Sequence, residues 1–288
     1  MDYLKSIVLV CLIFVSCQTT TKKQVSERIS TDELFPWCIV AYDSVERTPE
    51  QRITMLKEFG FTKYAYDWRD KHLDDTKKEL KLAVDNDIEV LSVWLWLNAK
   101  RDSIHKLSPA NNRLFNAVEE LDLKTTFWVS MSNNFFEELT DEESLKYAVQ
   151  MIDAVNEKAS AIGCKVALYN HTGWFGDIYN EIAIINTLPE ANLSMVYNFH
   201  HGRQDMDSFD SISVAMQPYL SAVNLNGMTE NGEKIMPIGS GDREKEMISQ
   251  LQKNGFDGPW GILGHVENVD VKGIIAKNIE GLKEIGKH

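Results

Sequence analysis

Short apolar runs and longer amphipathic segments alternate along the chain from residue 35 onward. The short runs are nearly continuous in apolar residues, which is typical of strands in a parallel sheet that is covered on both faces. The longer segments repeat apolar residues every three or four positions, as amphipathic helices do. The predicted strands are residues 37–43, 63–68, 88–97, 125–131, 165–171, 193–201, 221–227 and 259–265. The predicted helices are residues 49–59, 74–86, 109–121, 141–162, 179–188, 209–220, 243–254 and 271–285.

Local chemistry supports these boundaries. Thr48 precedes Pro49 at the start of one predicted helix, and Thr140 with Glu143 makes a capping box at the start of another. Three glycines stand where helices should end, because glycine readily adopts the left-handed conformation of a helix terminus. They are Gly60, Gly163 and Gly255.

Eight βα units in about 250 residues predict an α/β fold, a single (β/α)8 TIM barrel. The main alternative is an open, doubly wound sheet. Such a sheet usually carries a glycine-rich phosphate loop after its first strand, and the sequence has none there. No shift in composition marks a second domain, so residues 35–288 are expected to form one barrel domain.

The N-terminal residues have the pattern of an export signal. Lys5 precedes an apolar stretch, residues 7–15, that is too short to span a bilayer as a helix. The following Ser16-Cys17 resembles the cleavage site of a bacterial lipoprotein, in which the cysteine is lipidated. We therefore expect a signal peptide at residues 1–16 and a flexible tether at 17–34. The protein would then be exported and anchored at Cys17, on the periplasmic side or at the cell surface; an ordinary cleaved secretion signal is the alternative.

The charge of the chain narrows the range of partners. Its formal net charge is −13, which disfavours nucleic acid, because a phosphate backbone binds to basic surfaces. Beyond residue 17 the only cysteines are Cys38 and Cys164, and no Cys-x-x-Cys or Cys/His metal framework exists. Membrane contact is expected only through the lipid at Cys17.

Polar residues end four of the predicted strands in the second half of the chain. In a barrel the carboxyl ends of all strands surround one mouth, where activity is placed. His171, His201 and His265 are therefore the candidate catalytic residues. Further polar candidates for substrate binding share these strand ends: Asn170, Asn198, His200, Asn224 and Asn226.

Tryptophans end the strands in the first half of the chain, and Trp68, Trp94 and Trp96 are candidate substrate-binding residues. Aromatic planes beside polar groups suit a sugar, because its C–H faces stack on rings while its hydroxyls hydrogen-bond. The alternative for each tryptophan is plain packing between barrel and helices. A glycine-rich loop at 237–242 follows strand seven, where barrels often bind phosphate, although a simple turn with a helix cap explains it equally well.

The endings Y-N-H, N-F-H-H, N-L-N-G-M, P-I-G-S-G and G-I-L-G-H resemble those of the xylose-isomerase-like barrels, the sugar phosphate isomerase/epimerase superfamily. The lipoprotein-like start resembles an exported branch of that superfamily in Bacteroidetes-type bacteria. Members usually hold a divalent metal with acidic residues on strands five, six and eight and a histidine on strand six. In this chain His201 matches that histidine, while His171, Asn198 and His265 stand near the positions of the acids.

The resemblance implies an enzyme that acts on a small-molecule sugar. We expect a sugar isomerase or epimerase that transfers a proton next to the carbonyl of an unphosphorylated keto-sugar, with His171 and His201 as acid and base. A keto-sugar lyase or hydratase using the same site, and a saccharide-binding barrel without catalysis, are the alternatives. His171, His201 and His265 could also hold Zn²⁺ or another transition metal, because these metals bind imidazole nitrogens.

Overall fold

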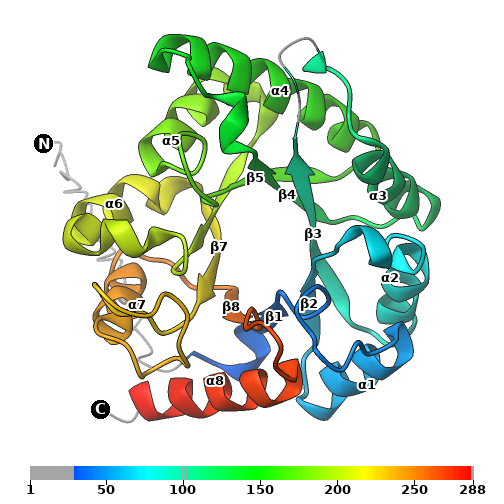
Figure 1. The fold of residues 1–288 in the computed structure, drawn as a ribbon, viewed down its shortest axis with the longest axis vertical. Helices are drawn as coiled ribbons and strands as arrows, with labels where there is room; N and C mark the ends of the chain where they lie inside the picture. The colour runs from blue at the N-terminus through cyan, green and yellow to red at the C-terminus, as the bar shows by residue number, and fades with distance from the viewer. Residues whose placement is uncertain (1–28, 99, 101–102, 287–288) are drawn as a thin grey trace, which may run out of the picture.

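The computed structural model describes residues 29–98, 100 and 103–286. Eight parallel strands form one sheet, and eight α-helices surround it (Figure 1). The strands are β1 (Leu34–Trp37), β2 (Lys63–Tyr66), β3 (Glu89–Leu97), β4 (Thr126–Met131), β5 (Lys165–Tyr169), β6 (Ser194–Asn198), β7 (Leu220–Leu225) and β8 (Trp260–Leu263). The helices are α1 (Pro49–Glu58), α2 (Thr76–Asp85), α3 (Pro109–Glu120), α4 (Asp141–Ala161), α5 (Ile178–Thr187), α6 (Phe209–Met216), α7 (Glu244–Lys253) and α8 (Val271–Ile285). The predicted (β/α)8 barrel is confirmed.

The predicted signal peptide, Cys17 and residues 17–28 of the predicted tether lie outside the described residues, so these features stay predictions. Among the described residues, no helix is both long enough and apolar enough to span a membrane.

The predicted caps are present. Thr48 and Thr140 each accept a backbone N–H at the start of α1 and α4 and complete a capping box. The three predicted helix-ending glycines all have positive φ, at Gly60, Gly163 and Gly255.

The first strand lies earlier in the chain than predicted. We predicted it at residues 37–43, whereas β1 is Leu34–Trp37 and includes Pro36. The chain leaves the strand at Cys38, which has a φ of 57°. Ile39 and Val40 are buried in the loop that follows, so their apolar run reflects burial and not strand conformation.

The sheet runs from β1 through β8 and on to β2, so β1 and β2 form its two ends. Asp67, directly after β2, fastens these ends together at the mouth. Its carboxylate accepts the backbone N–H of Val40 at 3.0 Å and that of Ala41 at 2.9 Å. Between β1 and β2, charge-assisted hydrogen bonds to this buried carboxylate thus take the place of strand pairing, and such bonds are stronger than those between neutral groups.

Aromatic side chains fill the barrel interior. Phe35 and Trp37 of β1 pack edge-on against Trp128 of β4, with Trp37 and Trp128 centroids 5.1 Å apart. Alanines on β2, β5 and β7 leave room for these rings, as alternation of large and small side chains in a barrel requires. The interior is therefore packed, and these rings form the floor beneath the mouth.

Candidate functional site

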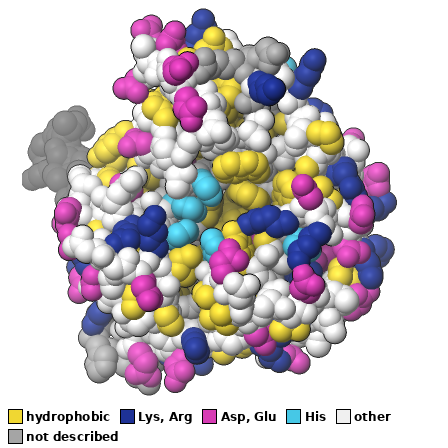
Figure 2. Space-filling model, viewed as in Figure 1, with side chains coloured by type: hydrophobic (Ala, Val, Ile, Leu, Met, Phe, Trp, Pro, Cys, Tyr) yellow, Lys and Arg dark blue, Asp and Glu magenta, His cyan; other side chains and the backbone are white. Residues whose placement is uncertain are grey.

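A pocket of about 60 Å³ opens at the carboxyl ends of the strands. Figure 2 shows histidine side chains gathered at a hollow in the centre of this face, beside hydrophobic side chains. The pocket is lined by residues that lie in or directly after six different strands, so the barrel itself brings them together. This is the place where activity is found in this fold.

Four histidines from three strand ends form one wall of the pocket. The ring centroids of His171 and His201 are 4.3 Å apart, and those of His201 and His200 are 4.4 Å apart. His265 continues the row at 5.6 Å from His200. The structure thus places the three predicted catalytic histidines together, and His200 lies between two of them.

The histidines lie in the loops just beyond the strands. β5, β6 and β8 end at Tyr169, Asn198 and Leu263, and each histidine follows by two or three residues. Asn198 sets the turn after β6, because its Oδ1 accepts the backbone N–H of His200 at 2.9 Å. The histidines therefore rest on short turns fixed by the ends of the strands.

Tyr169 supports this wall from below. Its hydroxyl is hydrogen-bonded to the indole N–H of Trp37 at 3.1 Å and to the Nδ2 of Asn198. Its ring lies edge-on to His201 at 5.7 Å. A tyrosine hydroxyl held by two donors in this way fixes the geometry above it, and burial raises the pKa of Tyr169 well above the ordinary value.

Arg69 lines the pocket together with Tyr42 and Trp94. The Arg69 guanidinium lies 4.8 Å from the centre of the Tyr42 ring and donates to the Tyr42 hydroxyl. Tyr42 in turn stacks on His265 with centroids 3.6 Å apart. An always-charged arginine is thereby held at the end of the histidine row.

Burial keeps the pocket histidines neutral. Desolvation is the largest cause, and it lowers the pKa of His171, His200 and His265 from 6.5 to about 4. Arg69 adds to this effect at His171 and His265, and neighbouring imidazoles add to it at His171 and His200. The pKa of His201, in the middle of the cluster, is lowered further by the same causes. At neutral pH all four rings can donate one hydrogen bond and accept another.

Three of the predicted substrate-binding asparagines lie outside the pocket lining. Asn170 is buried and bridges to the backbone of Asn198 on the neighbouring strand, through both its Oδ1 and its Nδ2. Asn226 donates to the backbone oxygens of Gly227 and Lys234 and so holds the loop after β7. Asn224 is completely buried beside Gly261 of β8. The amides of Asn170 and Asn226 are thus engaged by backbone groups outside the pocket, whereas neither amide atom of Asn224 has a hydrogen-bond partner among the described residues.

The three predicted tryptophans form a row along the mouth. Centroids of Trp68 and Trp94 are 6.1 Å apart, and those of Trp94 and Trp96 are 5.8 Å apart. Trp94 lines the pocket, and Trp96 lies edge-on to His171 at 5.1 Å. Trp68 is buried, and its N–H donates to the backbone oxygen of Trp94. Trp94 and Trp96, but not Trp68, therefore offer a ring face near the histidines.

Sequence reasoning missed Arg69 as a site residue, together with the pocket positions of Tyr42 and Asp67. The signal was present, because all three follow the first two strands and so belong to the mouth of a barrel.

The site is a poor fit to a metal ion. Zinc needs nitrogen ligands that converge to about 2 Å from one point. In the described part of the chain no three histidine, cysteine or acidic side chains form such a group. The histidines instead stand in a row, and the acidic ligands that hold hard cations are replaced by uncharged side chains. The geometry does not match the predicted metal site at His171, His201 and His265.

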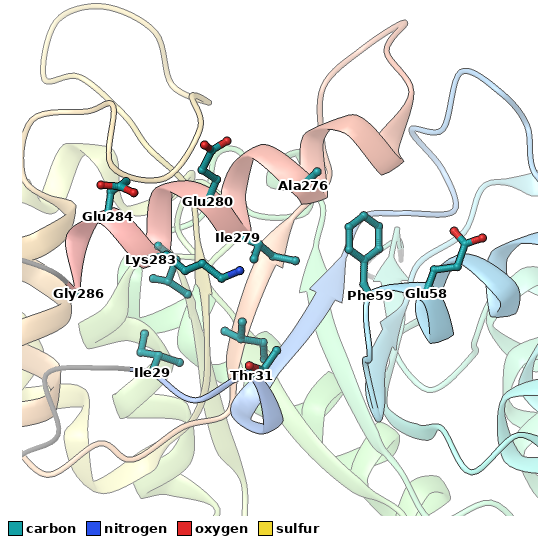
Figure 3. Close-up of a pocket in the computed structure, with 12 residues that line it drawn as sticks. Ile29, Thr31, Glu58, Phe59, Ala276, Ile279, Glu280, Lys283, Glu284 and Gly286 are labelled. Carbon is teal, nitrogen blue, oxygen red and sulfur yellow. The ribbon is translucent and has the colours of Figure 1, made fainter.

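A larger groove, of about 790 Å³, lies at the opposite end of the barrel. It is formed by the start of β1 and the last turns of α1 and α8, as Figure 3 shows. Ile279 and Phe59 give it an apolar surface, while Glu58 and Lys283 lie along it. In this fold activity is placed at the carboxyl ends of the strands, and this groove lies at the other end of the barrel. The smaller pocket is therefore the candidate site.

Comparison with known proteins agrees with this architecture. The family model described as "Xylose isomerase-like TIM barrel" matches residues 42–285. No curated protein sequence matches the chain. The 3-keto-D-glucoside 4-epimerase YcjR from E. coli superimposes with a TM-score of 0.66 at 13% identity, covering 88% of this chain and 99% of that chain.

Two further solved structures are similar. L-ribulose 3-epimerase gives a TM-score of 0.66 at 13% identity and covers 88% of this chain and 95% of that chain. The IolI protein, solved with a zinc atom bound, gives a TM-score of 0.64 at 12% identity and covers 88% of this chain and 97% of that chain. At these identities the likeness establishes the shared barrel.

Proposed function

This chain belongs to the xylose isomerase-like TIM barrel family, and we propose that it is a sugar isomerase or epimerase that transfers a proton next to a keto-sugar carbonyl. The names of two similar structures support this proposal, since both are epimerases of keto-sugars or ketoses. An unphosphorylated sugar is proposed as substrate, in keeping with the export signal expected at residues 1–16 and the lipid anchor expected at Cys17.

The observation that carries the proposal is the pair of neutral imidazoles, His171 and His201, with ring centroids 4.3 Å apart on one wall. Moving a proton on or off carbon requires an acceptor and a donor within reach of the same substrate atom. A neutral imidazole provides either function, and its N–H can also polarise a carbonyl oxygen. We assign the proton transfers to this pair.

Arg69 and Tyr42 supply the complementary charge. When a proton leaves the carbon, negative charge develops on the neighbouring carbonyl oxygen, and preorganised donors stabilise it. The Arg69 guanidinium and the Tyr42 hydroxyl line the same pocket as the histidines. The same negative charge raises the pKa of nearby imidazoles, which strengthens a base whose pKa is about 4 in the empty pocket.

A deuterium-exchange experiment tests this function. The full chain is incubated in D₂O with D-fructose, D-psicose, L-ribulose, D-fructuronate and a 3-keto-glucoside, and NMR follows deuterium entering carbon. We expect exchange with at least one of them, reduced at least about a hundredfold in His171→Asn and His201→Asn. His105→Asn is the matched control, because His105 is an exposed histidine outside the pocket.

The products separate the alternatives that start from the same site. A new ketose or epimer supports isomerase or epimerase chemistry. An unsaturated or dehydrated product shows a lyase or hydratase, which shares the first proton transfer. Saturable binding without exchange by any of the sugars, or full activity in both histidine variants, would reject the assignment.

A further inference from the structure

Arg69 forms no ion pair with an acidic side chain among the described residues. Ion pairs in the described part of the chain engage Arg47, Arg52 and Arg113 but not Arg69. Among the described residues its guanidinium donates to the backbone oxygen of Trp68 and to the Tyr42 hydroxyl, which leaves further N–H groups of the guanidinium unused. A half-buried guanidinium with spare donors is a site for an anion.

The surroundings of Arg69 neutralise it only in part, through the electrostatic attraction of the buried Asp67. Four neutral histidines share its pocket, and each is more easily protonated when a negative charge arrives. Asp67 is the one carboxylate on the pocket lining, and both its oxygens are engaged by backbone N–H groups. Glu267 is largely exposed and lies 3.7 Å from His265. The pocket as a whole therefore favours a ligand that brings its own negative charge.

We propose that the substrate of this site is an acidic sugar, such as a keto-hexuronate, whose carboxylate binds to Arg69. This proposal rests on the proposed function and specifies the class of sugar. A carboxylate matches the planar fork of a guanidinium with two parallel hydrogen bonds. The pocket volume of about 60 Å³ is well below the roughly 300 Å³ that enclose a whole small ligand. The carboxylate end enters the pocket, and the sugar ring lies at the mouth beside Trp94 and Trp96.

A phosphate is the other common acidic group of sugars, and the structure favours it less. Barrels usually bind phosphate through free backbone N–H groups in the loop after strand seven. In this chain that loop is already occupied, because the N–H of Gly241 donates to the carboxylate of Glu244 at 2.8 Å. Asp242 of this loop and Glu246 in the first turn of α7 add negative charge to the same groove, beside Lys245 and Lys277.

Calorimetric titration with three matched ketoses tests the proposal: D-fructuronate, D-fructose and D-fructose 6-phosphate, which differ only at the terminal carbon. We expect fructuronate to bind at least about tenfold more tightly than either of the others, with an affinity that falls as salt is added. In Arg69→Gln the preference for fructuronate should disappear. Arg113→Gln is the matched control, since Arg113 is an exposed arginine paired with Asp74 far from the pocket.

Folding of each variant is checked by thermal unfolding, and Arg69→Lys keeps the charge if Arg69→Gln does not fold. The lysine variant should retain a weaker preference for fructuronate, because a point charge lacks the two-pronged geometry. Equal binding of fructose and fructuronate overturns the proposal, as does tightest binding of the phosphate, a preference that survives in Arg69→Gln, or no binding of fructuronate at millimolar concentration.

This outcome is independent of the outcome for catalysis. If fructuronate binds through Arg69 but takes up no deuterium, the acidic ligand stands and the enzymatic function fails. If neutral ketoses exchange deuterium but fructuronate binds no more tightly than fructose, the enzymatic function stands and the acidic substrate is rejected.

Discussion

Replacing His171 by asparagine should weaken the dependence of stability on pH. The pKa of His171 is lowered from 6.5 to about 4 by burial, with further contributions from His200 and Arg69. The unfolded chain therefore binds more protons than the folded chain between these two values. The stability associated with the neutral ring is complete above the unfolded pKa and is lost as the pH falls toward 4.

The size of the effect follows from the shift. One pKa unit corresponds to about 1.4 kcal/mol, so a fall from pH 7 to pH 5 removes roughly 2 kcal/mol for one such histidine. Because the ring is partly exposed, we reduce this to about 1–2 kcal/mol. Asp205, whose pKa is raised to about 6, acts in the opposite direction, but it is present in wild type and variant alike.

Urea unfolding followed by tryptophan fluorescence at pH 7 and pH 5 measures the difference. The wild-type protein should lose about 1–2 kcal/mol more than His171→Asn on acidification, and His105→Asn controls for removal of an exposed imidazole. An NMR titration of the imidazole Cε1–H signals gives an independent reading. If His171→Asn and wild type show the same pH slope, the ring is not held neutral by burial, and the reasoning about the acid–base pair fails with it.

Three further substitutions test the packing that positions the site, each by urea unfolding at pH 7. Asp67→Asn weakens the hydrogen bonds between the chain after β2 and the loop after β1, and it should lower the free energy of unfolding by about 1–3 kcal/mol. Unchanged stability would show that the two ends of the sheet stay together without these bonds. Glu181 is completely buried, burial raises its pKa well above the ordinary value, and neither carboxylate oxygen has a partner among the described residues. Glu181→Met should therefore stabilise by about 1–3 kcal/mol, and a loss would reveal a hidden partner. Arg52→Met leaves the buried carboxylate of Glu79 without its partner and should lower the free energy of unfolding by about 3–5 kcal/mol. Adding Glu79→Leu should recover most of this loss, and a double variant as unstable as the single one would contradict the reasoning.

The barrel could be predicted from the sequence because periodicity reports burial, and nearly all buried runs in this chain are strands or helix faces. The exception shows the limit of that signal. Cys38, Ile39 and Val40 are apolar and buried, but they lie in the loop after β1, and the strand itself contains Pro36. A pattern of apolar residues cannot separate a buried loop from a strand, whereas the positive φ at Cys38 does.

The location of the site could also be predicted, because parallel strands must bring their carboxyl ends to one mouth. The roles of its asparagines could not. Asn198 lines the pocket, while Asn170, on the next strand, bonds to the backbone of its neighbour. Whether an amide side chain at a strand end points into the pocket or toward the backbone of the neighbouring strand depends on the turn that follows it. Arg69 escaped notice for the same reason, since its position over Tyr42 follows from the packing of two loops.

The charge of the mouth connects these observations. This chain places an arginine and four neutral imidazoles around the opening of the pocket. In the reaction that we propose, an enediolate needs positive charge beside it, and Arg69 would provide that charge. Positive charge without acidic ligands also attracts a negatively charged ligand before any chemistry occurs. Under the two proposals, Arg69 both stabilises the reacting oxygen and selects an acidic sugar. Its replacement should therefore impair turnover of every substrate, and it should weaken the binding of acidic sugars most of all.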